Sequence, residues 1–209
     1  MMTRSELVTE FRDWIDQRNT AIVTAAIANR EINRAYRELR GKINDRNYRF
    51  YYKSSTVTTI AATPYVDFPS DCVSVNKLVD SDSNVLLHRD LEMFDHTLAT
   101  AEPIRWDTAG RHLIFSPIPD NTYTYTIYYT YDPGDMSSDS AVPVFVPGYE
   151  DVIAIKAAIN SKMIRDEATK DMAQNVYVER LLSLLAAVGT GQTSSSRRVI
   201  QSTFDLGDF

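Results

Sequence analysis

The sequence contains few of the residues that support covalent, redox or metal chemistry. Its 209 residues include one cysteine, three histidines and seven glycines. With Cys72 as the only cysteine, an internal disulfide framework is excluded, and the chain suits a reducing compartment. No run approaches the roughly 18 apolar residues of a membrane span. The first 12 residues carry four charges and no apolar signal core, so we expect synthesis in the cytoplasm.

Recognisable catalytic and metal-binding motifs are also missing. His88 and His96 are eight residues apart, which is not a metal-ligand spacing. Cys72 has no histidine near it in the sequence, which argues against a nucleophile. The segment 189–194 resembles a phosphate-binding loop superficially, but Gln192 occupies the place of the essential lysine and the segment follows a helix pattern. The sequence therefore predicts no enzyme, no metal site and no cofactor.

Charge is unevenly distributed along the chain, whose formal net charge is −6. Residues 48–145 contain 13 acidic and 6 basic side chains, whereas residues 1–47 contain 7 acidic and 9 basic ones. The middle of the chain would repel a phosphate backbone, which argues against a general nucleic-acid binder. A simple contribution to solubility would explain the same excess.

Residues 1–47 have a helical pattern. Thr3 and Glu6 have the spacing of a capping box, and Asn19-Thr20 offers a second N-cap. An apolar stripe at helical spacing follows, formed by Ala28, Ile32, Ala35, Leu39 and Ile43. Beside it runs a row of arginines: Arg30, Arg34, Arg37 and Arg40. Such a row indicates either a solvated face or a contact surface.

Residues 48–145 change to the period of β-strands. The strongest pattern spans Thr122–Tyr131, where four tyrosines and Ile127 alternate with threonines. Its tyrosine face predicts core packing, with a stacking platform for single-stranded nucleic acid as the alternative. Ala109-Gly110 lies between two short apolar runs and predicts a hairpin. Residues Asp90–Leu98 could form a short helix.

Residues 146–189 return to helical spacing, with a first helix beginning near Tyr149 and a last helix ending at Gly189. Each helical part has one apolar stripe that it cannot bury alone, so we expect the two parts to pack together. The predicted fold is α+β, with an antiparallel helical bundle from both ends of the chain, an inserted antiparallel β domain and an extended C-terminal tail.

The tail comprises residues 190–209. Its first part, Gly191–Ser196, has the composition of a flexible linker. Its second part is richer in large apolar and basic residues than disordered tails usually are. We therefore predict a partner-binding motif made of Arg197, Arg198, Val199, Ile200, Phe204, Leu206 and Phe209. A frayed terminus is the alternative.

The order of the segments resembles the head–tail connector adaptors of tailed phages, especially the portal adaptors of short-tailed phages. The similarity covers roughly residues 5–188. It rests on the succession of a helical N-terminus, a tyrosine-rich strand and the segments Tyr65–Asp71, Val73–Val79, Pro103–Trp106, Leu113–Asp120 and Val144–Asp151. Each motif alone contains turn-forming residues that occur in many β proteins. The resemblance therefore depends on the order in which all of these segments follow one another.

The resemblance implies a structural virion protein without catalytic residues. Such adaptors form a ring beneath the portal, commonly of twelve copies, which extends the DNA channel and attaches tail components. The implied partners are the portal protein, neighbouring adaptor subunits and a tail or nozzle protein. DNA would pass through the lumen without specific binding, and no membrane is involved. In this family a C-terminal extension reaches the portal, which would suit Thr190–Phe209.

Two other functions remain open at this point. The chain could be a different tail or head-completion subunit of a virion, which would also lack catalytic motifs. It could also be a hydrolytic or carbohydrate-binding β module with a helical cap. In that case the tyrosine face and Trp106 would stack on sugar rings.

Overall fold

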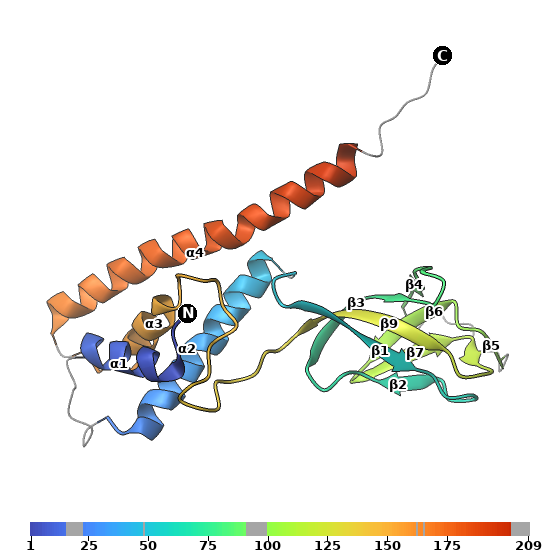
Figure 1. The fold of residues 1–209 in the computed structure, drawn as a ribbon, viewed down its shortest axis with the longest axis horizontal. Helices are drawn as coiled ribbons and strands as arrows, with labels where there is room; N and C mark the ends of the chain where they lie inside the picture. The colour runs from blue at the N-terminus through green and yellow to red at the C-terminus, as the bar shows by residue number, and fades with distance from the viewer. Residues whose placement is uncertain (16–22, 48, 91–99, 162, 165, 202–209) are drawn as a thin grey trace, which may run out of the picture. The chain divides into compact units, whose positions relative to one another are not determined.

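A computed structural model describes residues 1–15, 23–47, 49–90, 100–161, 163–164 and 166–201, the last twelve of these by their backbone alone. The chain divides into two units (Figure 1). A helical unit contains Met1–Phe50 and Asp135–Phe209, and a β unit contains Tyr51–Gly134. The α+β class with a β insertion between two helical parts is therefore confirmed.

The described residues of the helical unit form four helices, whose bounds are α1 (Arg4–Trp14), α2 (Ala25–Arg46), α3 (Asp151–Ser161) and α4 (Glu167–Gln201). The predicted capping box starts α1, because Thr3 Oγ1 accepts from the Glu6 amide at 3.3 Å and Glu6 accepts from the Thr3 amide at 2.6 Å. Thr24 caps α2. The cap expected at Asn19-Thr20 lies outside the described residues.

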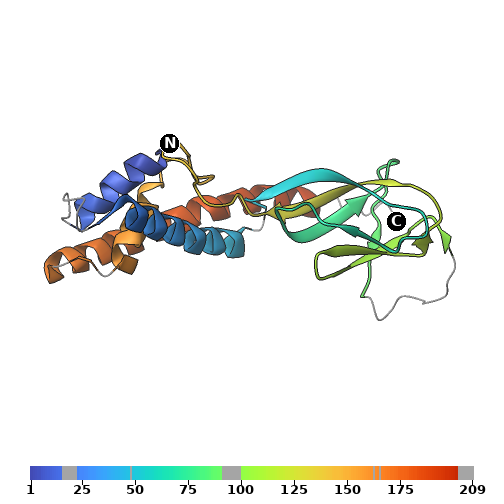
Figure 2. The same ribbon diagram turned by 90° about the horizontal axis from the view of Figure 1, so that it is seen from below.

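The core of the helical unit draws on both ends of the chain. Helix α3 packs against α1 and α2, and α4 packs against α2 and α3 (Figure 2). The buried side chains include Leu7, Phe11, Ala28, Ile32, Ala35, Leu39, Ile43, Val152, Ile153 and Ile155. This confirms the predicted packing of the N-terminal helices on the C-terminal helices.

Helix α4 is longer than the sequence pattern indicates. Gly189 was expected to end it, but the helix continues to Gln201 (Figure 1). A Cβ atom at Gly189 would lie 3.1 Å from Arg46 Nε, so this glycine makes room for a neighbouring side chain and does not terminate the helix. The linker-like segment Gly191–Ser196 is accordingly helical in backbone.

Outside residues 91–99, which the structure does not describe, the β unit forms two main sheets and one short pairing. The first sheet has the order β1-β9-β3, formed by β1 (Tyr52–Thr58), β9 (Thr124–Tyr131) and β3 (Cys72–Val79). The second has the order β2-β7-β6-β4, formed by β2 (Tyr65–Asp67), β7 (His112–Ser116), β6 (Arg105–Ala109) and β4 (Leu87–His88). The third pairs β5 (Thr100–Ala101) with β8 (Ile118–Pro119). The main pairings are antiparallel, and the two-residue pairings of β4 and β5 are parallel.

The tyrosine face of β9 forms the centre of the β core, as predicted. Tyr125, Ile127 and Tyr129 are at most 1% exposed. The predicted hairpin joins β6 to β7, with Gly110 at a φ of 61° that favours glycine. The helix predicted for Asp90–Leu98 lies, after Asp90 itself, outside the described residues.

Candidate interaction surfaces

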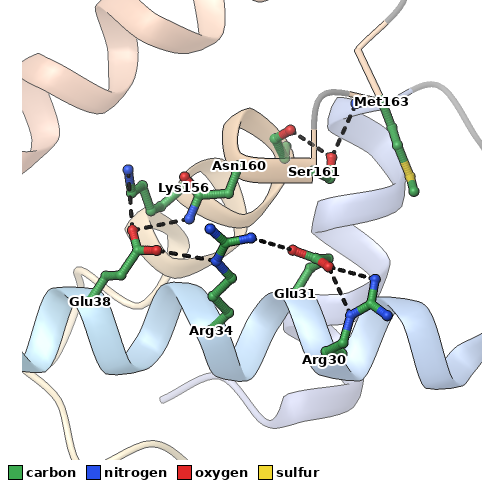
Figure 3. A network of polar contacts seen from close by, with 9 residues as sticks. Arg30, Glu31, Arg34, Glu38, Lys156, Asn160, Ser161 and Met163 are labelled. Atoms are coloured by element: carbon green, nitrogen blue, oxygen red, sulfur yellow. Dashed lines mark hydrogen bonds and ion pairs between the residues drawn. The ribbon is translucent and has the colours of Figure 1, made fainter.

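The arginines of α2 are held by carboxylates. Arg30 binds Glu31 at 2.9 Å, Arg34 lies 3.4 Å from Glu38, and Arg37 lies 2.7 Å from Asp135 (Figure 3 shows the first two). The side chains of Arg30, Arg34 and Arg37 nevertheless remain more than half exposed. They form a solvated row whose charge is largely balanced by its neighbours.

Glu38 links this row to α3. It accepts from Asn160 Nδ2 at 3.1 Å and lies 3.4 Å from Lys156 Nζ (Figure 3). Partial burial opposes its ionisation, but the Asn160 hydrogen bond and the charges of Lys156 and Arg34 outweigh that effect and lower the pKa of Glu38. The network therefore fixes α2 against α3 with its carboxylate ionised.

Residues 135–148 form a strap along the N-terminal helices. Asn33 and the backbone of Met136 exchange two hydrogen bonds of 3.1 and 3.2 Å. The Tyr36 hydroxyl bonds the backbone of Val144, and Arg4 donates to the Met136 carbonyl at 2.8 Å. Residues 135–145, which the sequence pattern grouped with the β segment, belong to the helical unit.

Arg40 completes the row from a buried position. Its side chain is 9% exposed and its guanidinium lies 4.6 Å from the centre of the Tyr36 ring. Asp135, at the start of the strap, lies 3.9 Å away. Arg40 and Arg37 therefore both hold the strap through Asp135, Arg40 from a buried position and Arg37 from the exposed row.

The β unit carries the acidic excess of the chain. Residues 51–134 contain 11 acidic and 5 basic side chains, which accounts for the whole net charge of −6. Some of these carboxylates are paired, for example Asp107 with His88 at 3.2 Å and Asp67 with His112 at 2.7 Å. An acidic surface of this kind repels nucleic-acid phosphates.

Groups that could carry chemistry are not gathered in the described part of the chain. Burial raises the pKa of the Cys72 thiol to about 11, which keeps it protonated near neutral pH. No three histidine, cysteine, aspartate or glutamate residues there are grouped as metal ligands. A hollow of about 420 Å³ between α3 and α4 contains one Glu167–Lys170 pair, at 3.2 Å, and otherwise small or apolar residues.

The stacking surfaces considered from sequence are largely occupied by packing within the β unit, and of the tyrosine face only Tyr123 and Tyr131 are partly exposed. Tyr125 and Tyr129 are buried, and Trp106 is 2% exposed with its indole N–H donating to the Leu86 carbonyl at 3.2 Å. These rings cannot stack on a sugar or a base without unfolding the β core. The carbohydrate and single-strand hypotheses therefore lose Tyr125, Tyr129 and Trp106 as stacking residues.

Comparison with known proteins identifies the family. The chain matches the family model described as SU10 adaptor protein over residues 2–202. It belongs to the SU10 adaptor protein family. This is a family of phage head–tail adaptors, and the resemblance drawn from the order of segments is thereby confirmed. No curated protein matches the chain.

For this adaptor the structure locates only part of the predicted tail motif. Arg197, Arg198, Val199 and Ile200 lie near the end of α4, where the backbone alone is described. Phe204, Leu206 and Phe209 lie outside the described residues. None of the helices in the described ranges is both long enough and apolar enough to span a bilayer.

Sequence reasoning missed the strap. Its anchors, Asn33 and Tyr36, bond to backbone groups more than 100 positions away. Spacing patterns within one segment carry no signal for such contacts. The one local hint is polarity, since Asn33 is a polar residue beside the apolar stripe of α2.

Proposed function

We propose that this adaptor forms a ring of about twelve copies beneath the phage portal, extends the DNA channel and provides the attachment surface for tail or nozzle proteins. Membership of the head–tail adaptor family carries the proposal. The location would be the virion connector, after assembly in the host cytoplasm. The division of the chain into two units supports this proposal, because a self-contained helical unit can form a ring while the inserted β unit contacts other components.

The charge distribution suits DNA passage. The β unit is acidic, and the exposed arginines of α2 are already paired with Glu31, Glu38 and Asp135. Tight DNA binding requires several free basic side chains on phosphates. We therefore expect purified protein to bind duplex DNA weakly at physiological salt. Tight binding with a steep salt dependence would contradict a non-adhesive channel.

Residues 190–209 serve as the portal anchor in this proposal. The binding residues are Arg197, Arg198, Val199, Ile200, Phe204, Leu206 and Phe209. Burying a Leu or Phe side chain contributes roughly 1.5–3 kcal/mol, but ordering any backbone that α4 does not already hold costs about 1–2 kcal/mol per residue. One tail would bind weakly, and a ring of tails would hold through multivalency.

Co-sedimentation with portal rings tests the anchor. A chain without residues 190–209 should stay folded, because it keeps Ala173, Tyr177, Leu184 and Val188, which are the buried residues among the described side chains of α4. It should no longer join the portal. A full-length chain with Phe204, Leu206 and Phe209 changed to serine should behave in the same way.

The matched control changes Thr193, Ser194 and Ser195 to alanine in the full-length chain and should bind the portal normally. If the truncated chain assembles with the same occupancy as wild type, the anchor lies in the helical unit. Electron microscopy of the virion tests the broader proposal, because an adaptor must appear as a ring directly below the portal. Density for the subunit anywhere else would refute it.

A further inference from the structure

The outer face of α2 is basic and contains an unexplained glycine. Arg30, Arg34, Arg37 and Gly41 follow one another at steps of four, three and four residues, so they share one face of the helix. The buried stripe of α2 lies on the opposite side. Each guanidinium has five N–H donors, so an arginine with one carboxylate partner can still bind another. We call these four residues the arginine face.

Gly41 has no role within its own chain. It lies in the interior of α2, where glycine is less favourable than alanine. A Cβ atom added there would meet nothing within 4 Å, and its φ is not in the left-handed region. Glycine on an exposed helix face permits another helix to approach closely. The residue therefore indicates an external packing partner.

The outer face of α4 has the complementary chemistry. Asp171, Val178 and Leu182 follow at steps of seven and four residues, with Glu179 beside them. Val178 is 50% exposed and Leu182 is 64% exposed. Asp171 and Glu179 form no ion pair with any residue that the structure describes. We call these four residues the acidic face.

We propose that the acidic face of one subunit packs on the arginine face of the next. The two faces match in length, since Arg30 to Arg37 spans about 10.5 Å and Asp171 to Glu179 about 12 Å along their helices. Opposite charges would pair across the contact, and Leu182 would lie over Gly41. Two different faces make a heterologous contact, which closes into a ring when the rotation per subunit permits.

A second copy fits the acidic face better than the other occupants do. Carboxylates around Val178 and Leu182 would repel DNA, whereas the N–H donors that Arg30, Arg34 and Arg37 do not use on their own carboxylate partners could bind them. Within its own chain α4 uses a different side, where Ala173, Tyr177 and Leu184 are buried. The inference rests on the proposed ring, so its test must separate the interface from the ring itself.

Disulfide trapping tests the contact directly. Two full-length chains, Gly41→Cys and Leu182→Cys, would be mixed, one carrying a size tag, assembled on portal rings and mildly oxidised. Cys72 can stay in place because it is buried. We expect mixed dimers in large excess over dimers of either variant alone. Assembly of both variants without mixed dimers would overturn the interface.

Assembly of matched variants gives an independent measurement. Gly41→Leu should reduce ring occupancy on the portal at least about tenfold, as a bulky side chain prevents close approach, whereas Gly41→Ala should reduce it much less. Asp171→Arg combined with Glu179→Arg should also block assembly. Asp82→Arg in the β unit is the control: it also replaces a carboxylate with a guanidinium, but outside the proposed contact, and should leave assembly unchanged.

The outcomes distinguish the two proposals. If wild-type protein forms no ring on the portal, the proposed function fails. If wild type and all the variants assemble equally, the ring stands and the interface is wrong. If Arg34→Glu alters retention of duplex DNA but not assembly, the arginine face contacts DNA, which also refutes the interface.

Discussion

Replacing Tyr36 with phenylalanine removes one hydroxyl group from the helical unit and leaves the aromatic ring in place. That hydroxyl donates to the Val144 carbonyl at 3.2 Å and accepts from the Val144 amide at 3.0 Å. Both hydrogen bonds join α2 to the strap of residues 135–148. We therefore expect Tyr36→Phe to weaken the attachment of the strap without changing the core around it.

The size of the effect follows from the geometry. A hydrogen bond contributes about 0.5–1.5 kcal/mol net, so two bonds set a range of about 1–3 kcal/mol. Val144 is 44% exposed, and water can replace part of what its backbone loses. The ring contacts with Phe145, at 6.3 Å, and Arg40, at 4.6 Å, survive the change, so no cavity forms. The expected loss is about 1–2 kcal/mol.

Tyr177→Phe is the matched control for this prediction. The Tyr177 hydroxyl is buried and has no hydrogen-bond partner in the described part of the helical unit. Its removal should change the free energy of unfolding by less than about 0.5 kcal/mol, or stabilise the protein. Urea unfolding followed by helical circular dichroism measures both variants, and amide exchange of Val144 should accelerate only in Tyr36→Phe. Equal losses in the two variants would refute the hydrogen-bond reasoning.

Three further variants test individual contacts by urea unfolding. Gly41→Ala should stabilise the isolated subunit by about 0.5–1 kcal/mol, and a destabilisation would mean that the glycine has a role within the chain. The hydrogen bond from Lys53 lowers the pKa of Asp71 in the folded state. The hydrogen bond therefore stabilises the protein fully above the pKa that Asp71 has in the unfolded chain, and this stabilisation disappears as pH falls through the folded-state pKa. Asp71→Asn should therefore destabilise the protein at about pH 7, and this loss should shrink only as pH falls below about 4 and through the lowered folded pKa of Asp71. A loss independent of pH would contradict this. Burial, aided by the charge of Asp151, raises the pKa of Glu10, so the ionised carboxylate costs stability. Glu10→Gln should therefore stabilise the protein at about pH 7 but not at about pH 4. A loss of stability at pH 7 would contradict this reasoning.

Local periodicity predicts much of this fold because it reports which face of an element is buried. In β9 the alternation of Tyr125, Ile127 and Tyr129 with threonines identifies the core face, and these residues are buried. In α2 the stripe from Ala28 to Ile43 identifies the face that packs on α3. Both cases depend only on side chains within one element, which a single sequence contains.

Contacts between residues far apart in the sequence cannot be predicted from local periodicity. Gly189 has the local signature of a helix end, but it is small because Arg46, from the other end of the chain, lies against it. Tyr36 adjoins the apolar stripe of α2 in the sequence, and nothing local indicates that its hydroxyl bonds to the backbone of Val144. The choice of such partners is determined by the packed arrangement of helices, which no local spacing encodes.

The division of charge between the two units is consistent with their proposed roles. The β unit carries the whole net charge, and the helical unit is balanced, with 17 acidic and 17 basic side chains. Within that balance the exposed helices differ: α2 presents Arg30, Arg34 and Arg37, whereas α4 presents Asp171 and Glu179. A unit without net charge can associate with its own copies without accumulating repulsion. The acidic unit gains nothing from self-association, but it can adjoin DNA without retaining it.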